Sequence, residues 1–261
     1  MWRKASDLKR AGTVFIFICG VVLLFAFALP QNHFTIFMAG DSTMSVKQVK
    51  AYPETGWGMP FANYFDSGVT IDNRARNGRS TKTFISDGLW DSIMKDLKPN
   101  DYVFIEFGHN DEVDTKASYT KEDEYKANLV RFVADVKNKR GIPILFTPVT
   151  RRNFDSTGHI KETHLAYSKI VREVAASQKV NMIDLDELTR SFFDKYGPDY
   201  SIFFFNNLTP GENPNYPEGR KDNTHYNELG ARKVAEIVLQ AIKDLKLPLA
   251  DHIVKPLTNP K

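Results

Sequence analysis

Cysteine is nearly absent from this sequence, and its scarcity excludes two kinds of stabilised protein. The 261 residues include a single cysteine, Cys19, so one chain can form neither a disulfide framework nor a cysteine-based zinc cluster. An excess of one charge is also lacking. Removing the four basic and one acidic residues of positions 1–28 from the totals of 35 and 32 leaves 31 of each. A globally basic surface is therefore not indicated, and we expect no nucleic-acid partner.

A long hydrophobic run lies near the N-terminus. Residues 14–29 are uncharged and rich in Phe, Ile, Val and Leu, and they follow a basic patch. Residues 26–28, Ala-Phe-Ala, have the small-x-small form of a signal-peptidase site, so the pattern predicts a signal peptide over residues 1–28 and export to the periplasm or the extracellular space. The alternative is an uncleaved anchor in a membrane, because the run counted from Ala11 is long enough to span one.

The remaining sequence alternates short apolar runs with amphipathic stretches. The apolar runs predict strands at residues 34–39, 69–73, 102–107, 142–147 and 181–185. The amphipathic stretches predict helices at residues 81–97, 122–140, 162–178, 187–196 and 227–245. This alternation is typical of parallel βαβ units, so we predict an α/β fold, a three-layer α/β/α sandwich with a five-stranded parallel sheet. We expect one monomeric domain over residues 34–250, a long loop over residues 197–221 and a tail over residues 251–261.

Polar turns that contain glycine follow three of the predicted strands. They are residues 40–43 (Gly-Asp-Ser-Thr), 74–80 (Arg-Ala-Arg-Asn-Gly-Arg-Ser) and 108–111 (Gly-His-Asn-Asp). Ligands of open α/β sheets bind beyond the carboxyl ends of the strands, so these turns are expected to meet at one edge. A fourth polar segment, residues 222–225 (Asp-Asn-Thr-His), comes just before the last predicted helix.

These four segments hold the groups that an acyl-transfer reaction needs. Ser42 could be the nucleophile, and His225 could be the base that a weakly acidic hydroxyl requires. Asp222 lies three positions before His225 and could orient its ring. The backbone N–H groups of Ser42 and Gly78 and the side-chain amide of Asn110 could stabilise an oxyanion. Gly78 could instead serve only a turn, and Asn110 could cap a loop.

Together the segments resemble the sequence blocks of the SGNH (GDSL-like) hydrolases, and most of all the rhamnogalacturonan acetylesterase branch. The likeness extends to residues 56–58 (Gly-Trp-Gly), 81–84 (Thr-Lys-Thr-Phe) and 147–152 (Thr-Pro-Val-Thr-Arg-Arg), and it covers residues 34–245. The resemblance implies a flavodoxin-like fold with a serine esterase site. In that site Ser42 is the nucleophile, His225 is the general base and Asp222 is its orienting partner. Gly78, Asn110 and the Ser42 N–H form the oxyanion hole.

Four further residues could contact a substrate: Trp57, His109, Arg151 and Arg152. Trp57 could stack on a sugar ring or belong to the local core. Either arginine could bind a galacturonate carboxylate, or it could form an ordinary ion pair. No metal is expected, because the spacing of the nearest candidate ligands matches no known type of site; these are His159, Glu162 and His164.

The sequence therefore predicts an exported serine esterase. We expect it to remove O-acetyl groups from a plant cell-wall polysaccharide or oligosaccharide, above all pectic rhamnogalacturonan, through an acetyl-enzyme on Ser42 and without a cofactor. The alternative is an esterase with the same site that acts on acetylated xylan, peptidoglycan, a lipid or a thioester. A glycan-binding module with an inactive site is disfavoured, because all four blocks are intact.

Overall fold

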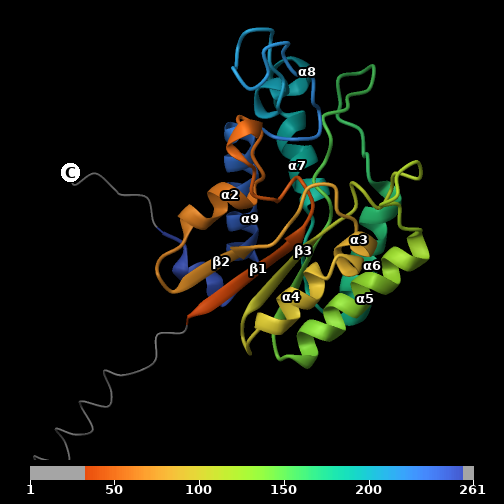
Figure 1. Ribbon diagram of the computed structural model, residues 1–261, viewed down its shortest axis with the longest axis vertical. Coiled ribbons are helices and arrows are strands. Elements are labelled where there is room, and N and C mark those ends of the chain that lie inside the picture. Colours follow the sequence, from red (N-terminus) through yellow and green to blue (C-terminus); the bar gives the residue numbers. More distant parts are fainter. Residues whose placement is uncertain (1–32, 255–261) are drawn as a thin grey trace, which may run out of the picture. The chain divides into compact units, whose positions relative to one another are not determined.

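Five parallel strands form one sheet in the structure, a computed structural model that describes residues 33–254 (Figure 1). The strands lie in the order β2-β1-β3-β4-β5, and each neighbouring pair is parallel. They are β1 (Phe34–Gly40), β2 (Val69–Asn73), β3 (Tyr102–Glu106), β4 (Ile142–Phe146) and β5 (Asn181–Ile183). Every strand predicted from an apolar run is present, and the ends agree to within about two residues, the usual spread in strand boundaries.

Successive residues of a strand face opposite sides of the sheet, and each side covers its own hydrophobic core. In β1, Ile36 and Met38 belong to one core, whereas Phe37 and Ala39 belong to the other. All side chains of the central strand β3 are buried. Because both faces of these strands are shielded from water, their sequences are apolar runs rather than alternating patterns.

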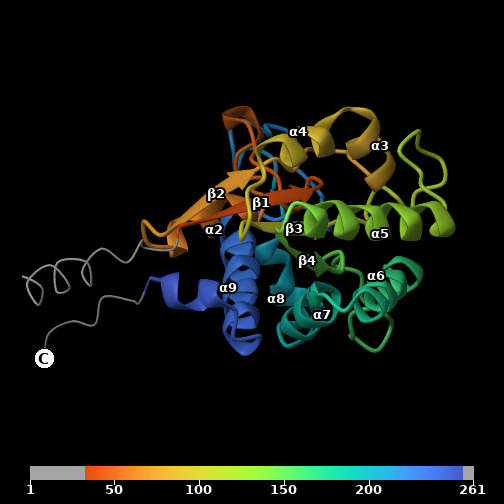
Figure 2. The same ribbon diagram turned by 90° about the horizontal axis from the view of Figure 1, so that it is seen from below.

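Helices cover both faces of the sheet (Figure 2). One core is shared with α3 (Thr81–Ser86), α4 (Leu89–Asp96), α5 (Glu122–Asn138) and α6 (Leu165–Gln178). The other core is shared with α2 (Gly58–Phe61), α7 (Leu185–Asp194) and α9 (Glu228–Asp244). The predicted three-layer α/β/α sandwich with a five-stranded parallel sheet is confirmed.

Some helix boundaries differ from those predicted. The helix expected over residues 81–97 is two helices, because Gly88 adopts a left-handed conformation (φ 70°) between α3 and α4. The helix expected from Glu162 begins at Leu165. The long loop expected over residues 197–221 starts with two short helices, α8 (Gly197–Tyr200) and the 3₁₀ helix η3 (Ser201–Phe204). Two other 3₁₀ turns are η1 (Val49–Ala51) and η2 (Ala62–Tyr64).

The ends of the described region bear on the predicted domain boundaries. The predicted signal peptide or anchor over residues 1–28 lies outside the described residues. Within residues 33–254, no helix has both the length and the apolar character needed to cross a bilayer. At the other end, the 3₁₀ helix η4 (Pro248–His252) is bonded to the domain, since the His252 carbonyl accepts the Asp66 N–H at 2.9 Å. The folded domain therefore continues beyond residue 250, where we expected a tail.

Candidate active site

The turn after β1 holds Ser42 at the carboxyl edge of the sheet. Gly40 ends the strand against Glu106 of β3, and a Cβ on Gly40 would lie only 2.9 Å from the Glu106 carbonyl oxygen. The buried carboxylate of Asp41 then fixes the turn, because its Oδ1 accepts the N–H and the hydroxyl of Thr43, each at 2.9 Å. The half-buried Ser42 is therefore held in place between Asp41 and Thr43, which are hydrogen-bonded to each other.

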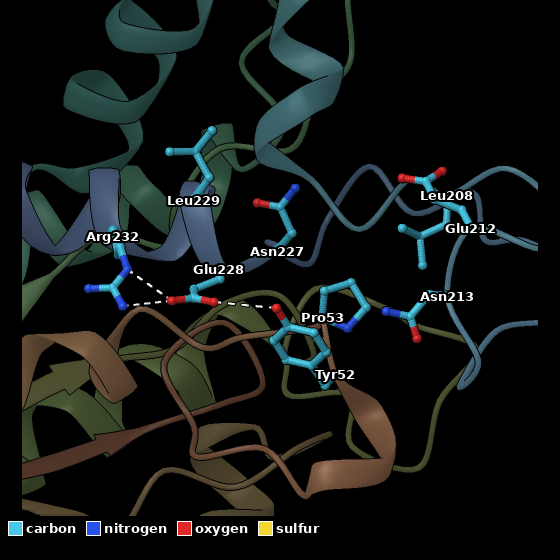
Figure 3. Close-up of a pocket in the computed structure, with 9 residues that line it drawn as sticks. All are labelled: Tyr52, Pro53, Leu208, Glu212, Asn213, Asn227, Glu228, Leu229 and Arg232. Atoms are coloured by element: carbon cyan, nitrogen blue, oxygen red, sulfur yellow. Dashed lines mark hydrogen bonds and ion pairs between the residues drawn. The ribbon is translucent and has the colours of Figure 1, made fainter.

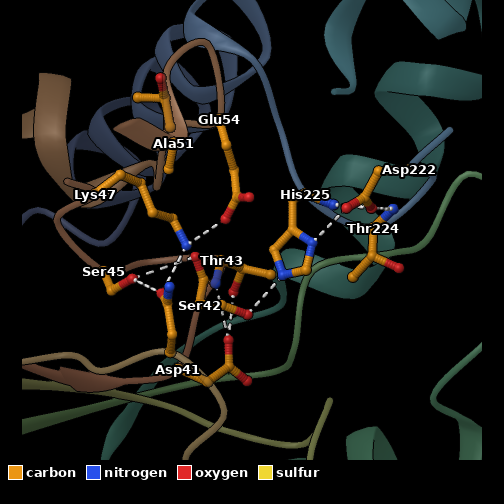
Figure 4. Close-up of polar contacts among 12 residues, drawn as sticks. Asp41, Ser42, Thr43, Ser45, Lys47, Ala51, Glu54, Asp222, Thr224 and His225 are labelled. Atoms are coloured by element: carbon orange, nitrogen blue, oxygen red, sulfur yellow. Dashed lines mark hydrogen bonds and ion pairs between the residues drawn. The ribbon is translucent and has the colours of Figure 1, made fainter. Parts of the chain in front are cut away.

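Ser42 lies in a hydrogen-bonded series with His225 and Asp222 (Figure 4). The Ser42 Oγ is 2.8 Å from His225 Nε2, although the two residues are 183 positions apart in the sequence. On the other side of the ring, His225 Nδ1 is 2.8 Å from Asp222 Oδ2. The imidazole is thus held with one nitrogen on the carboxylate and the other on the hydroxyl, the arrangement of an activated serine nucleophile.

The Asp222 carboxylate is held by several donors. Its Oδ1 accepts the backbone N–H groups of Thr224 at 2.9 Å and of His225 at 3.0 Å, and Arg220 lies 3.0 Å from Oδ2. Burial alone would raise the pKa of Asp222, but the hydrogen bond and charge of His225 and the backbone donors hold that pKa well below its usual value. The side chain is therefore a carboxylate at neutral pH.

Three N–H donors predicted to form an oxyanion hole come from the turns after β1, β2 and β3. Within the described residues, the backbone N–H groups of Ser42 and Gly78 have no acceptor, and the side of Gly78 that would carry a Cβ faces open space. Asn110 donates from its side-chain nitrogen to the Arg79 carbonyl at 3.1 Å, which leaves its second N–H available. The structure therefore offers unpaired donors beside the Ser42 turn.

A comparison with models of protein families shows to which family this chain belongs. The model of the GDSL-like Lipase/Acylhydrolase family matches residues 38–233. The chain belongs to this family. It is 38% identical over 227 residues to the rhamnogalacturonan acetylesterase RhgT of Bacillus subtilis, a match that covers 87% of this chain and 97% of RhgT. It is 33% identical over 232 residues to YesY of the same organism, named as a probable rhamnogalacturonan acetylesterase, covering 86% and 98% of the two chains.

A solved structure shares the fold of this chain. The structure of the YxiM protein of Bacillus subtilis resembles this chain with a TM-score of 0.72 and 27% identity. The match covers 83% of this chain and 58% of YxiM, so this chain spans little more than half of that protein. The family model and the sequence relatives show that this protein is an esterase, as predicted.

The sequence analysis missed a buried carboxyl group, that of Glu106, which contacts Thr43 in the turn that holds Ser42. Thr43 Oγ1 lies 2.9 Å from Asp41 Oδ1 and 3.2 Å from Glu106 Oε1. The Thr43 hydroxyl thus lies between two carboxyl oxygens, and Glu106 Oε1 also accepts the Val149 N–H at 3.3 Å. Burial, together with the charge of Asp41, raises the pKa of Glu106 to about 8. An acidic residue ending the apolar strand β3 was the signal for this group.

Trp57 belongs to this buried group, and its predicted contact with a sugar ring is wrong. The side chain is fully buried, and its indole N–H donates to Glu106 Oε2 at 2.7 Å. No face of the ring is left for a sugar, because Phe61 and Phe146 pack against it. Trp57 is therefore a core residue that supports the carboxyl edge of the sheet.

Arg151 connects two of the predicted catalytic segments. Its guanidinium donates to the Thr224 hydroxyl at 2.7 Å and to the His109 carbonyl at 3.3 Å, and it pairs with Glu112 at 3.1 Å. Glu112 in turn lies 2.8 Å from His164 Nδ1. The segment that carries Asn110 and the segment that carries His225 are thus held together by one side chain, and Arg151 has its charge balanced without a substrate.

The other predicted contacts are also engaged within the protein. Arg152 donates to Ser201 Oγ at 3.0 Å and to Asn223 Oδ1 at 3.2 Å. His109 is 4% exposed and packs on His164 with ring centroids 4.3 Å apart, and burial holds the pKa of His109 well below its usual value. His109 is therefore buried rather than open to a substrate as we expected, whereas Arg152 is half-buried and its contact with a substrate stays a prediction.

Lys47 is a further residue that the sequence analysis missed. Its buried Nζ lies 2.9 Å from Glu54 Oε1 and donates to Asn77 Oδ1 at 2.8 Å, while Ser45 donates to the same oxygen at 2.6 Å. These contacts fix Asn77 beside Gly78. No local pattern marks such a lysine, because its partners lie in other segments.

Proposed function

We propose that this esterase removes O-acetyl groups from a plant cell-wall polysaccharide or oligosaccharide, and above all from pectic rhamnogalacturonan. One observation carries the proposal: Ser42, His225 and Asp222 form a hydrogen-bonded series at the sheet edge. The choice of substrate rests on the 38% identity to RhgT, which extends over 97% of that rhamnogalacturonan acetylesterase.

In the proposed reaction, Ser42 Oγ attacks the acetyl carbonyl carbon while His225 Nε2 accepts the hydroxyl proton. Asp222 stabilises the resulting imidazolium through Nδ1. The oxyanion accepts hydrogen bonds from the N–H groups of Ser42 and Gly78 and from Asn110, and each such donor is worth on the order of 10²–10³ in kcat.

The tetrahedral intermediate then breaks its bond to the sugar oxygen, which takes the proton from His225 and leaves as a hydroxyl. Ser42 now carries the acetyl group as an ester. A water molecule gives its proton to His225 and attacks that ester, so that acetate leaves and the proton returns to Ser42 Oγ. The side chains named supply each proton transfer, and the scheme requires no cofactor.

The experiment is to measure acetate release by the wild type and Ser42→Ala on acetylated rhamnogalacturonan, acetylated xylan and O-acetylated peptidoglycan. We expect the wild type to prefer rhamnogalacturonan, and Ser42→Ala to lose roughly 10⁶-fold in kcat while unfolding at the same temperature. A folded variant that keeps most of its activity would remove Ser42 from the mechanism. If the wild type prefers xylan or peptidoglycan, the proposed substrate is wrong but the proposed mechanism is unaffected.

We also propose that the protein is exported by its N-terminal segment. The basic patch and the uncharged run over residues 14–29 support this proposal. N-terminal sequencing of protein recovered from the medium or periplasm should give a chain that starts after residue 28. Recovery of the intact chain in the membrane fraction would instead favour the anchor.

A further inference from the structure

A hollow of about 370 Å³ lies beside the Ser42 turn, and its lining is positively charged. It is formed between residues 45–51 and residues 75–79. Its lining includes Lys50, Arg76 and Arg79 and no acidic residue. The hollow shown in Figure 3 differs, because it contains Glu212 and Glu228 with a single arginine. Positive charge is therefore concentrated at this place, although the charges of residues 29–261 balance as a whole.

Two of the three cations are free to bind a ligand. The side chains of Lys50 and Arg76 are exposed and have no ion pair or hydrogen bond within residues 33–254. Arg79 differs, because its Nε lies 2.5 Å from Asp87 Oδ2. The two unpaired charges on opposite walls of the hollow would favour an anion between them.

The hollow shares a wall with the proposed oxyanion hole. The lining residues Asn77 and Arg79 flank Gly78, and the Arg79 carbonyl accepts the Asn110 amide at 3.1 Å. Ser45, on the other wall, donates to Asn77 at 2.6 Å and lies three positions after Ser42. The hollow and the proposed oxyanion hole thus adjoin through these residues, which makes a sugar next to the acetylated one the ligand that this position favours.

We propose that this hollow binds the carboxylate of a uronic acid residue of the substrate chain, with Arg76 and Lys50 as the residues that determine specificity. The guanidinium of Arg76 can bind a carboxylate through two parallel N–H groups, and Lys50 adds a second positive charge. Val46 lines the same hollow and is 60% exposed, so it offers an apolar surface to the sugar ring. The inference rests on the proposed function, because it names which part of that substrate is recognised.

The test compares Lys50→Gln/Arg76→Gln with the wild type on three substrates. They are an acetylated oligosaccharide that contains galacturonate, an acetylated xylo-oligosaccharide and p-nitrophenyl acetate. We expect the ratio of kcat/KM for the galacturonate substrate to that for p-nitrophenyl acetate to fall roughly 10-fold, mainly through KM. The corresponding ratio for the neutral xylo-oligosaccharide should stay the same. Arg76→Lys alone should give a smaller loss, because it keeps the charge and loses the paired N–H groups.

A matched control removes two positive charges from another place. Lys126 and Lys169 line a hollow between α5 and α6, so Lys126→Gln/Lys169→Gln should leave all three activities as in the wild type. An equal loss in both double variants would show a general effect of net charge and would overturn the proposal. So would an unchanged ratio in Lys50→Gln/Arg76→Gln.

The wild type separates failure of the subsite from failure of the proposed function. If the wild type releases acetate from the galacturonate substrate and the Lys50→Gln/Arg76→Gln variant does so equally well, only the subsite is wrong. The alternative outcome is that the wild type hydrolyses p-nitrophenyl acetate but releases no acetate from substrates that contain galacturonate. The proposed function would then be wrong, and the proposed uronic acid subsite would be wrong as well.

Discussion

Replacing Asp222 by asparagine isolates the contribution of one negative charge to the proposed mechanism. Asp222 Oδ2 lies 2.8 Å from His225 Nδ1, so the carboxylate accepts the proton on that nitrogen and leaves Nε2 free to take the Ser42 proton. An asparagine amide group in the same place can donate to Nδ1 instead. The ring would then carry its proton on Nε2, where it cannot accept one from Ser42.

The expected loss can be worked out from the distance. Unit charges 2.8 Å apart attract by roughly 6 kcal/mol at an effective dielectric constant of about 20. His225 is partly exposed, so the attraction in the protein is smaller. A loss of about 10⁴-fold in kcat, as expected for a carboxylate-to-amide change at such a position, corresponds to about 5 kcal/mol. The attraction is an upper limit of the same order as the expected loss, so the charge of Asp222 supplies a large part of the effect and the changed ring tautomer supplies the rest.

The assay is hydrolysis of p-nitrophenyl acetate at pH 8, with thermal unfolding measured on the same samples. Asp222→Asn should lose about 10⁴-fold in kcat with little change in KM. The control is Arg220→Gln, which removes the half-exposed cation that also contacts Asp222 Oδ2 at 3.0 Å. Such an exposed ion pair is worth at most about 1 kcal/mol, so this control should lose no more than about fivefold. A folded Asp222→Asn within tenfold of the wild type would refute the reasoning.

Two further predictions concern the supports of the site. Arg151→Gln should lower kcat roughly 10- to 100-fold at nearly constant KM, because it loses the Thr224 and Glu112 contacts that align two proposed catalytic segments. Arg151→Lys should recover part of the activity. An unchanged kcat in Arg151→Gln would make Arg151 purely structural. Burial raises the pKa of Glu106 from 4.5 to about 8, so between these pH values Glu106 takes up a proton when the protein folds. The free energy of unfolding therefore falls as the pH rises through this range, by up to about 1.4 kcal/mol per pH unit. Urea titrations at pH 5 and pH 8 should show a shallower decline in Glu106→Gln, and equal declines would contradict a buried neutral acid.

Much of the fold follows from local sequence, because buried parallel strands need unbroken apolar runs and packed helices need a one-sided apolar stripe. The gathering of Ser42, Gly78 and Asn110 was predictable for a related reason, since a parallel sheet brings the turns after its strands to one edge. His225 follows no strand but precedes α9, so only the resemblance to the hydrolase family placed it beside Ser42. Local patterns also placed Asp222 and His225 in one turn. The break at Gly88 was harder, because a single glycine can lie within a helix or end it.

The roles of Trp57 and Arg151 could not be read from their neighbours in the sequence. Trp57 is buried because it meets Glu106, which lies 49 positions away, and Arg151 is engaged because Thr224 lies within reach, 73 positions away. A side chain that could bind a sugar or a carboxylate in isolation is the same side chain that binds a distant part of its own protein. Only the packed structure distinguishes these two uses.

The distance along the chain between Ser42 and His225 has a consequence for synthesis. Their contact spans 183 positions, whereas Asp222 and His225 are neighbours in one turn. Ribosomes make the nucleophile early and its base late, so an incomplete polypeptide released before residue 225 cannot activate its serine. Under the proposed mechanism, the ester-cleaving capacity of this molecule should therefore arise only once synthesis has passed that point.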